Sequence, residues 1–165
     1  GKLPELRRIS ADYAPVGSLG DLNKCHELTH ASFVGASCND LSVFRPLTKI
    51  QSVAFSSCSL SDIAQVLDMS SLRSVRLYDC NLSGSFFRAF DRERAITELE
   101  LVDCTVDSTS GLNDFTGLTV LRLTGTRGVS DWSELDSLTA LKTVYIDEGL
   151  SDCFTGEHQF EIIKE

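Results

Sequence analysis

The sequence predicts an α/β repeat solenoid, a single domain in which short parallel strands alternate with turns and helical arcs. Two observations lead to this prediction: one spacing of apolar residues recurs seven times, and a period of three fills the stretches between the recurrences. Composition agrees, since 165 residues with a hydrophobic fraction of 42% suffice for one domain with an apolar core.

Six of the seven recurrences start with an apolar residue, continue with apolar residues three and five positions later, and reach a small residue or cysteine eight positions after the start. Alternation such as Val75 and Leu77 predicts a short strand with one buried face. The seventh recurrence keeps only this strand half. The coils begin at intervals of 22 to 24 residues, at Leu6, Leu28, Ile50, Leu72, Ile96, Leu118 and Leu141.

Upstream of most strands the apolar residues recur every third position, as in Leu41, Phe44 and Leu47. This period fits tight 3₁₀ turns, in which side chains at i and i+3 eclipse. Since no coil can bury its apolar side alone, neighbouring coils must stack into one core. The interval from Leu72 to Ile96 is two residues longer than the usual 22, and Glu93 stands where an apolar residue is expected. These departures predict a bulge or fuller helical turn around residues 86–95.

The pattern resembles the leucine-rich-repeat consensus L-x-x-L-x-L-x-x-N/C-x-L over about residues 3–150. Residues 60–63 and 129–135 are similar to the 22-residue class found in internalins and phosphatase-regulatory subunits. The resemblance implies a right-handed curved arc, with a parallel β-sheet on the concave face and short 3₁₀ or helical turns on the convex face. It also implies a protein partner.

The chain departs from that consensus at its Asn position. An Asn ladder would hydrogen-bond free backbone groups in the turns. Cysteine and threonine do this weakly and alanine not at all, so water or backbone partners are expected to replace the ladder in the first coils. The residues at this position are Ala14, Ala36, Cys58, Cys80, Cys104, Thr126 and Gly149.

The six cysteines contain no C-x-x-C pair. Stacked coils bring Cys58, Cys80 and Cys104 close enough for a disulfide or a metal site, but we interpret them as small buried core residues. Cys25 and Cys38 also fall on core positions, which leaves Cys153 off the repeat. Free thiols predict a reducing compartment and a cytoplasmic location, with a surface or secreted protein as the alternative.

The sequence predicts no enzyme, cofactor or metal site. None of His26, His30 and His158 has metal-ligand spacing with another ligand, and no nucleophile elbow or phosphate-binding glycine loop occurs. A net charge of −9 opposes binding to nucleic acid or anionic membranes. No run of 18 apolar residues suggests a transmembrane helix.

The resemblance places the binding surface on the concave face. Coils two and three present small side chains there, and coils four to seven present arginine, tyrosine and acidic residues, of which the first two are enriched at interface hot spots. Alternatively, Arg76, Glu100 and Arg122 form a cross-strand charge ladder that merely tolerates exposure. The candidate patch comprises Arg76, Tyr78, Asp79, Glu98, Glu100, Val102, Asp103, Arg122 and Tyr145.

Residues 1–165 are therefore expected to form one leucine-rich-repeat domain of about seven coils, with residues 150–165 as a C-terminal cap. We expect the first coil to be covered by missing upstream sequence, a partner or self-association, because no apolar cap precedes it. The predicted function is a protein-interaction module or scaffold that binds through the concave face. The alternative is the recognition domain of a larger enzyme or of a cell-surface receptor or adhesin.

Overall fold

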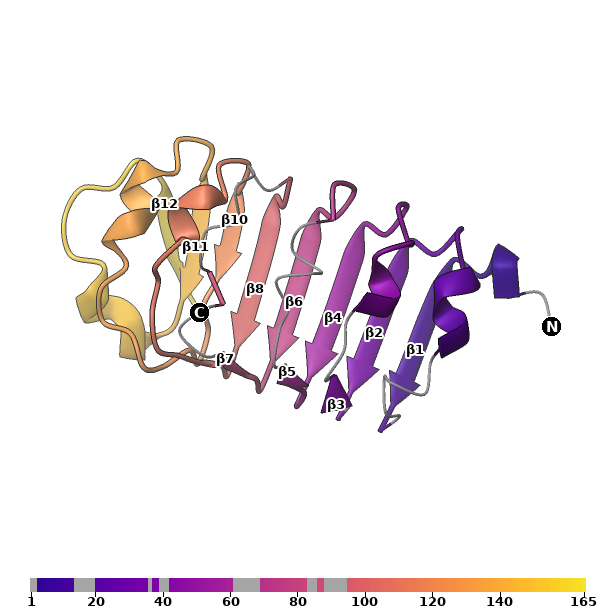
Figure 1. The fold of residues 1–165 in the computed structure, drawn as a ribbon. Helices are drawn as coiled ribbons and strands as arrows, with labels where there is room; N and C mark the ends of the chain where they lie inside the picture. The colour runs from indigo at the N-terminus through magenta and orange to yellow at the C-terminus, as the bar shows by residue number, and fades with distance from the viewer. Residues whose placement is uncertain are drawn as a thin grey trace.

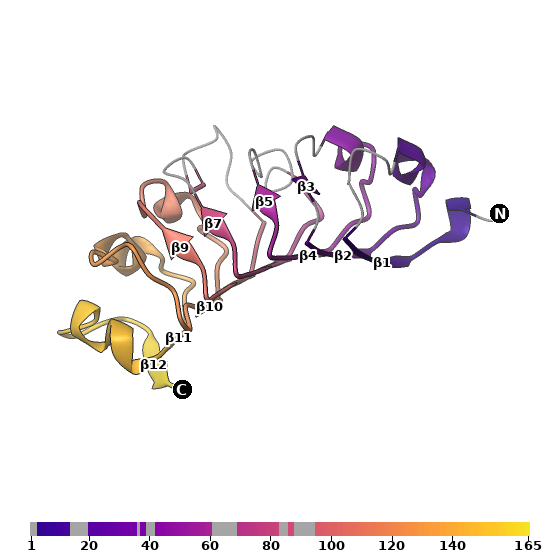
Figure 2. The same cartoon turned by 90° about the horizontal axis from the view of Figure 1, so that it is seen from below.

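The computed structural model describes residues 3–13, 20–35, 37–38, 42–60, 69–82, 86–87 and 95–165. Short strands and 3₁₀ segments alternate along the chain and form a curved arc with the termini at opposite ends (Figures 1 and 2). This architecture confirms the predicted repeat solenoid.

The inner side of the arc is one eight-stranded parallel sheet whose strands follow chain order (Figure 1). Its register is uniform, with Val53 opposite Val75 and Phe55 opposite Leu77. The strands are β1 (Arg8–Asp12), β2 (His30–Val34), β4 (Ser52–Ser56), β6 (Ser74–Tyr78), β8 (Glu98–Val102), β10 (Val120–Arg122), β11 (Thr143–Ile146) and β12 (Glu161–Lys164).

The outer side carries 3₁₀ turns and two small sheets, as Figure 2 shows. The small sheets pair β3 (Ser37–Cys38) with β5 (Ser59–Leu60) and β7 (Asn81–Leu82) with β9 (Thr105–Val106). The 3₁₀ segments are η1 (Leu3–Glu5), η3 (Gly20–Lys24), η4 (Ser42–Phe44), η5 (Leu112–Asp114), η6 (Ser133–Ser137) and η7 (Glu148–Cys153).

Among the described residues, none lies in a helix with the length and apolar character needed to cross a bilayer. The bulge expected around residues 86–95 falls mostly outside the described residues. Phe86 and Phe87, which are described, are buried in the core.

The C-terminal cap contains an eighth strand that the repeat pattern did not predict. β12 pairs in parallel with β11, so that Ile162 lies opposite Val144. Phe160 is buried and Ile162 is partly buried against the core, so this strand covers the apolar side of the seventh coil. The offset between paired residues drops from 22–24 to 18 here, as between Thr143 and Glu161. The 22-to-24-residue period therefore does not predict this strand.

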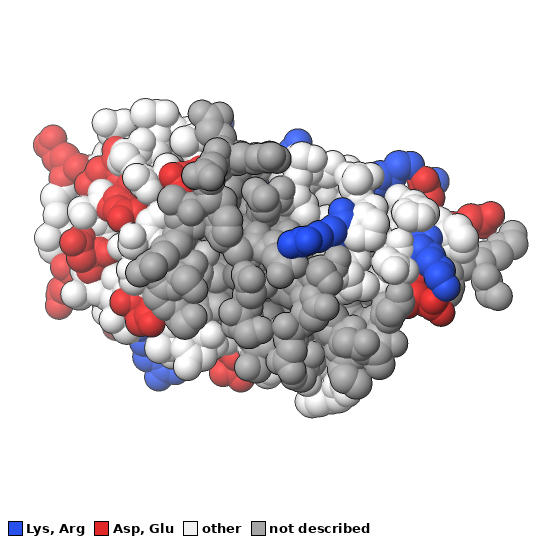
Figure 3. Space-filling model, viewed as in Figure 1, with Lys and Arg blue, Asp and Glu red and all other residues white. Residues whose placement is uncertain are grey.

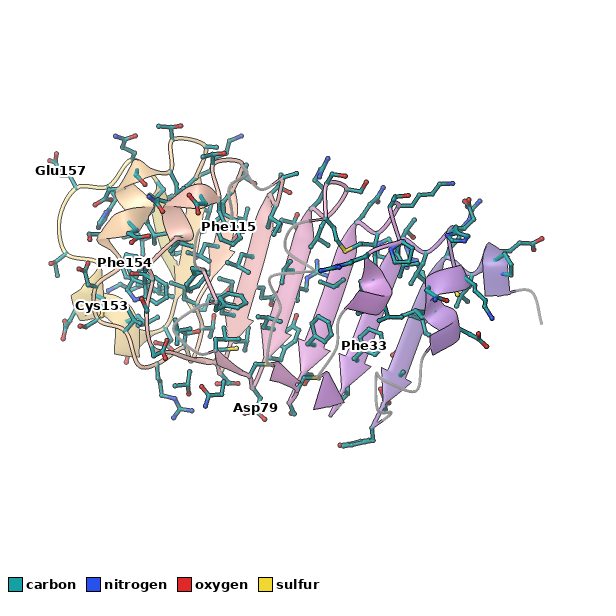
Figure 4. All side chains as sticks on the ribbon, in the orientation of Figure 1. Phe33, Asp79, Phe115, Cys153, Phe154 and Glu157 are labelled. Atoms are coloured by element: carbon teal, nitrogen blue, oxygen red, sulfur yellow. The ribbon has the colours of Figure 1, made fainter. Side chains whose placement is uncertain are left out.

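The core lies between the sheet and the outer turns, where Figure 4 shows Phe33 and Phe115. Phe33 stacks on Phe55 of the next coil with ring centroids 5.6 Å apart, and Phe44 packs edge-on against both rings. Burying one such side chain stabilises the fold by about 1.5–3 kcal/mol. Because each ring is buried by the adjacent coil, this stabilisation belongs to the stack and not to any single coil.

A ladder of side-chain donors replaces the consensus Asn. Each donor reaches the carbonyl of the third apolar residue in the preceding coil, and each of the three thiols shares its single S–H between that carbonyl and one two residues back in its own coil. The cross-coil pairs are Cys58 to Phe33 (3.6 Å), Cys80 to Phe55 (3.8 Å), Cys104 to Leu77 (3.4 Å) and Thr126 to Leu101 (2.8 Å). Ala14 and Ala36, where other partners were expected, lie outside the described residues.

Cys25, Cys80, Cys104 and Cys153 form no disulfide, and Cys25, Cys58, Cys80 and Cys104 are buried. This confirms their interpretation as core residues; the side chain of Cys38 lies outside the described part of the chain. Contact with the Cys80 thiol raises the pKa of Cys104, and burial adds to this shift. Burial likewise raises the pKa of Cys25. Within the described residues, no three His, Cys, Asp or Glu side chains group to hold a metal.

The ladder can be tested at Cys104, because threonine and valine have nearly the same shape and differ in one hydroxyl. Cys104→Thr keeps a side-chain donor, as Thr126 does in the next coil, whereas Cys104→Val removes the side-chain donor to the Leu77 carbonyl. We expect the threonine variant to be more stable by about 1 kcal/mol in urea denaturation. Its melting temperature should be about 2–4 °C higher. Equal stability of the two variants would show that the ladder contributes nothing.

Thiol reactivity should follow burial. We expect pulsed iodoacetamide at pH 8 to label Cys153, which is partly exposed, well before Cys25, Cys58, Cys80 and Cys104. Mass spectrometry of the peptides measures the order. In 8 M urea all these sites should react at similar rates, which serves as the control. Rapid labelling of any of the four buried thiols in folded protein would contradict their placement.

Candidate functional site

The concave face is built by strand residues that alternate with the buried ones. In β6, Val75 and Leu77 point into the core, so Arg76 and Tyr78 lie on the opposite, concave side. The register places Arg76 opposite Glu100 and Glu100 opposite Arg122. Since neighbouring strands lie about 4.8 Å apart, opposite charges meet across the sheet.

These charges form a connected ion-pair network. Arg76 Nε lies 3.3 Å from Glu100 Oε2, and Arg122 Nε lies 3.6 Å from Glu100 Oε1. Glu98 Oε2 lies 3.7 Å from Arg76 Nη2, and Glu165 pairs with Arg122 Nη1. Glu100 is 25% exposed and Arg122 30%, so water screens the centre of the network less than an ordinary surface pair. The predicted cross-strand ladder is thus present.

Two tyrosines flank the network. The Arg122 guanidinium lies over the Tyr145 ring, 4.3 Å from its centroid, which is a cation–π arrangement. Burial raises the pKa of the Tyr78 phenol, and the charge of Glu100 and its hydrogen bond with Tyr78 raise it further. Arg122 and Glu100 are therefore each held from several sides, which reduces the freedom they would lose on binding.

Asp79 and Asp103 lie at the rim of the concave face, where the chain turns away from the sheet (Figure 4 labels Asp79). Both adopt the left-handed conformation, with φ of 50° and 54°. This turn lets the Asp79 N–H donate to the Val102 carbonyl of the next coil at 2.9 Å. The other seven patch residues lie within the strands, and Val102 lies opposite Tyr78.

The repeat spacing did not predict Glu165 and Glu161 as surface residues, because both come with the unpredicted eighth strand. Glu165 pairs with Arg122 and also accepts a hydrogen bond from Thr124 Oγ1 at 3.2 Å. Glu161 lies opposite Thr143 and extends the concave face by one strand. The candidate surface therefore spans coils four to seven together with β12, which is counted below as coil eight.

In the N-terminal half of the concave face, β2 and β4 carry small side chains such as Ser32, Ala54 and Ser56. At the junction of the two halves lies Ser74, in register with Ser52 and Glu98. Its side chain is buried, and its Oγ has no hydrogen-bond partner among the described residues. A buried hydroxyl without a partner costs about 1–3 kcal/mol.

An open hollow of about 680 Å³ lies beyond the rim, lined by Asp103, Asp147, Arg127 and Cys153 among others. Asp147 has a structural role there, because its carboxylate accepts hydrogen bonds from the backbone N–H groups of Gly125 and Leu150. The outer face itself carries acidic side chains gathered over the C-terminal coils, as the space-filling view shows (Figure 3).

No family model matches the sequence, and no curated protein matches it. Among solved structures, an internalin (InlF) from Listeria monocytogenes superposes with a TM-score of 0.68 at 19% identity, covering 97% of this chain and 47% of its own. Internalin C2 from the same species gives a TM-score of 0.64 at 16% identity, covering 99% of this chain and 82% of its own. The chain thus spans less than half of the first internalin.

At these identities the similarity shows the fold alone, which is a leucine-rich-repeat arc.

Replacing Ser74 with alanine should stabilise the domain, because it removes a buried hydroxyl that has no partner. We expect a gain of about 1 kcal/mol in the free energy of unfolding, measured by urea denaturation. Ser52→Ala, on the neighbouring strand and in register, is the control and should change stability less. A loss of stability in Ser74→Ala would show that this hydroxyl is satisfied in solution.

Proposed function

We propose that this domain is a non-enzymatic protein-recognition module that binds a protein partner through the concave face of coils four to eight. The observation that carries the proposal is the connected network of Arg76, Glu100 and Arg122 with Tyr145 beside it. Arginine and tyrosine dominate interface hot spots when they are held in place and partly desolvated. A rigid sheet presents them at little entropic cost.

The network is more than a charge ladder in this proposal. A ladder that served only stability would contribute about 0–1 kcal/mol per exposed pair. Here the side chains of Arg76, Glu100 and Arg122 stay between 25% and 43% exposed, so they remain accessible while their positions are fixed. Accessible, pre-organised charges favour recognition through steering and specificity.

A second candidate is that the domain is the recognition part of a larger enzyme, surface receptor or adhesin. It is favoured by the comparison with the first internalin, since this chain corresponds to 47% of that protein. We further propose that the repeats belong to the 22-residue class found in internalins and phosphatase-regulatory subunits. Main-sheet partners separated by 22 residues, such as Val53 and Val75, support it.

We also propose that the protein works in a reducing compartment such as the cytoplasm. The free, buried thiols support this location, because an oxidising compartment favours disulfides. Its partners, on this proposal, do not include nucleic acid or membranes, because the net charge of −9 repels both.

The binding face can be tested by photo-crosslinking. A benzophenone amino acid at Tyr145 on the concave face, or at the exposed Glu157 away from it, is used to map contacts in native extract (Figure 4 labels Glu157). We expect defined protein adducts from position 145 and none of these from position 157. Adducts formed equally from both positions would contradict the proposal.

The network itself is tested by the triple substitution of Arg76, Glu100 and Arg122 by alanine. It should abolish the adducts formed from position 145 while leaving the far-ultraviolet circular dichroism unchanged. The matched control replaces two basic residues and one acidic residue on other faces: Lys24, Arg45 and Glu157. If the adducts persist in the first triple variant, the charged network does not bind the partner.

A further inference from the structure

We propose that the partner presents a segment rich in lysine and arginine to this surface, with one cationic side chain received between Ser74 and Glu98. This inference rests on the proposed function and gives the partner a chemistry. The balance of charge on the concave face and the unsatisfied hydroxyl of Ser74 support this chemistry.

Carboxylates outnumber cations on the concave side of coils four to eight. Both arginines are already engaged, Arg76 by Glu98 and Glu100, and Arg122 by Glu100 and Glu165. Glu161 adds a further exposed carboxylate and makes no ion pair among the described residues. The surface therefore retains negative charge after its internal pairing, which a basic segment complements.

Glu98 has acceptor capacity left for such a segment. Its side chain is 53% exposed, and its 3.7 Å contact with Arg76 is longer than a hydrogen bond of about 2.7–3.2 Å. Arg76 is held more closely by Glu100, at 3.3 Å. The Glu98 carboxylate can therefore turn toward an incoming cation without breaking the centre of the network.

Ser74 supplies the second acceptor. The residue is 8% exposed and its Oγ has no partner among the described residues, although it stands directly opposite Glu98 on the concave side of the sheet. An ammonium or guanidinium group has several donors, so once the side chains that cover the Ser74 Oγ move aside it can bond to the Glu98 carboxylate and to the Ser74 hydroxyl together. An acidic side chain at the same place would meet the charge of Glu98.

The test uses two fluorescein-labelled 12-residue peptides as probes, one of alternating lysine and serine and one of alternating glutamate and serine, in fluorescence anisotropy at low salt. We expect the basic peptide to bind and the acidic peptide not to bind. Glu98→Gln with Glu161→Gln should weaken binding about fivefold. Asp107→Asn with Glu157→Gln removes the same charge from exposed sites off the concave face and should weaken it less than about twofold.

Ser74→Ala separates binding from folding, because it should raise the melting temperature while weakening the basic peptide about threefold. Equal effects of the two double variants, absence of binding by the basic peptide, or unchanged binding by Ser74→Ala would each overturn the inference. Failure of the proposed function looks different. In that case the crosslinks from position 145 are absent. If only the proposed basic chemistry of the partner is wrong, these crosslinks persist and the basic peptide fails to bind.

Discussion

The structure depends on in-register parallel pairing between coils that cannot bury their own apolar sides. Val53 stands opposite Val75 and Phe55 opposite Leu77, so each side chain is covered by its equivalent one coil away. The same register stacks Phe33 on Phe55 and lets the Cys58 thiol reach the Phe33 carbonyl. A slip of one residue would turn the apolar side chains to solvent and break both contacts.

This register also builds the candidate surface on the concave face, because a strand presents alternate residues to opposite faces. The buried residues can stay apolar in every coil for stability, while the residues on the concave face vary from coil to coil. Arg76, Glu100 and Arg122 occupy equivalent positions in successive coils and meet because the core residues beside them are aligned. Fold and candidate site therefore share one geometric cause but use different side chains.

The sequence predicted the strands and the buried cysteines well, since both follow from spacing alone. It failed at β12, where the offset of 18 residues departs from the period, and so it missed Glu165 as the partner of Arg122. Other features depend on side-chain rotamers, which spacing does not determine. The position of Arg122 over Tyr145 is one of these. Ala14, Ala36 and Glu93 lie outside the described residues, so predictions made there stay predictions.

Folding stability alone does not explain why residue 74 is a serine. Elsewhere in the described part of the chain a buried hydroxyl has a partner: Thr126 is buried, and its Oγ1 donates to the Leu101 carbonyl at 2.8 Å. Ser74 is buried to a similar degree without such a partner, and alanine would fill the position at lower free energy. A destabilising polar group on the face proposed for binding is what a trade of stability for recognition produces. On the proposal made above, this hydroxyl gains its hydrogen-bond partner from a donor of the bound protein.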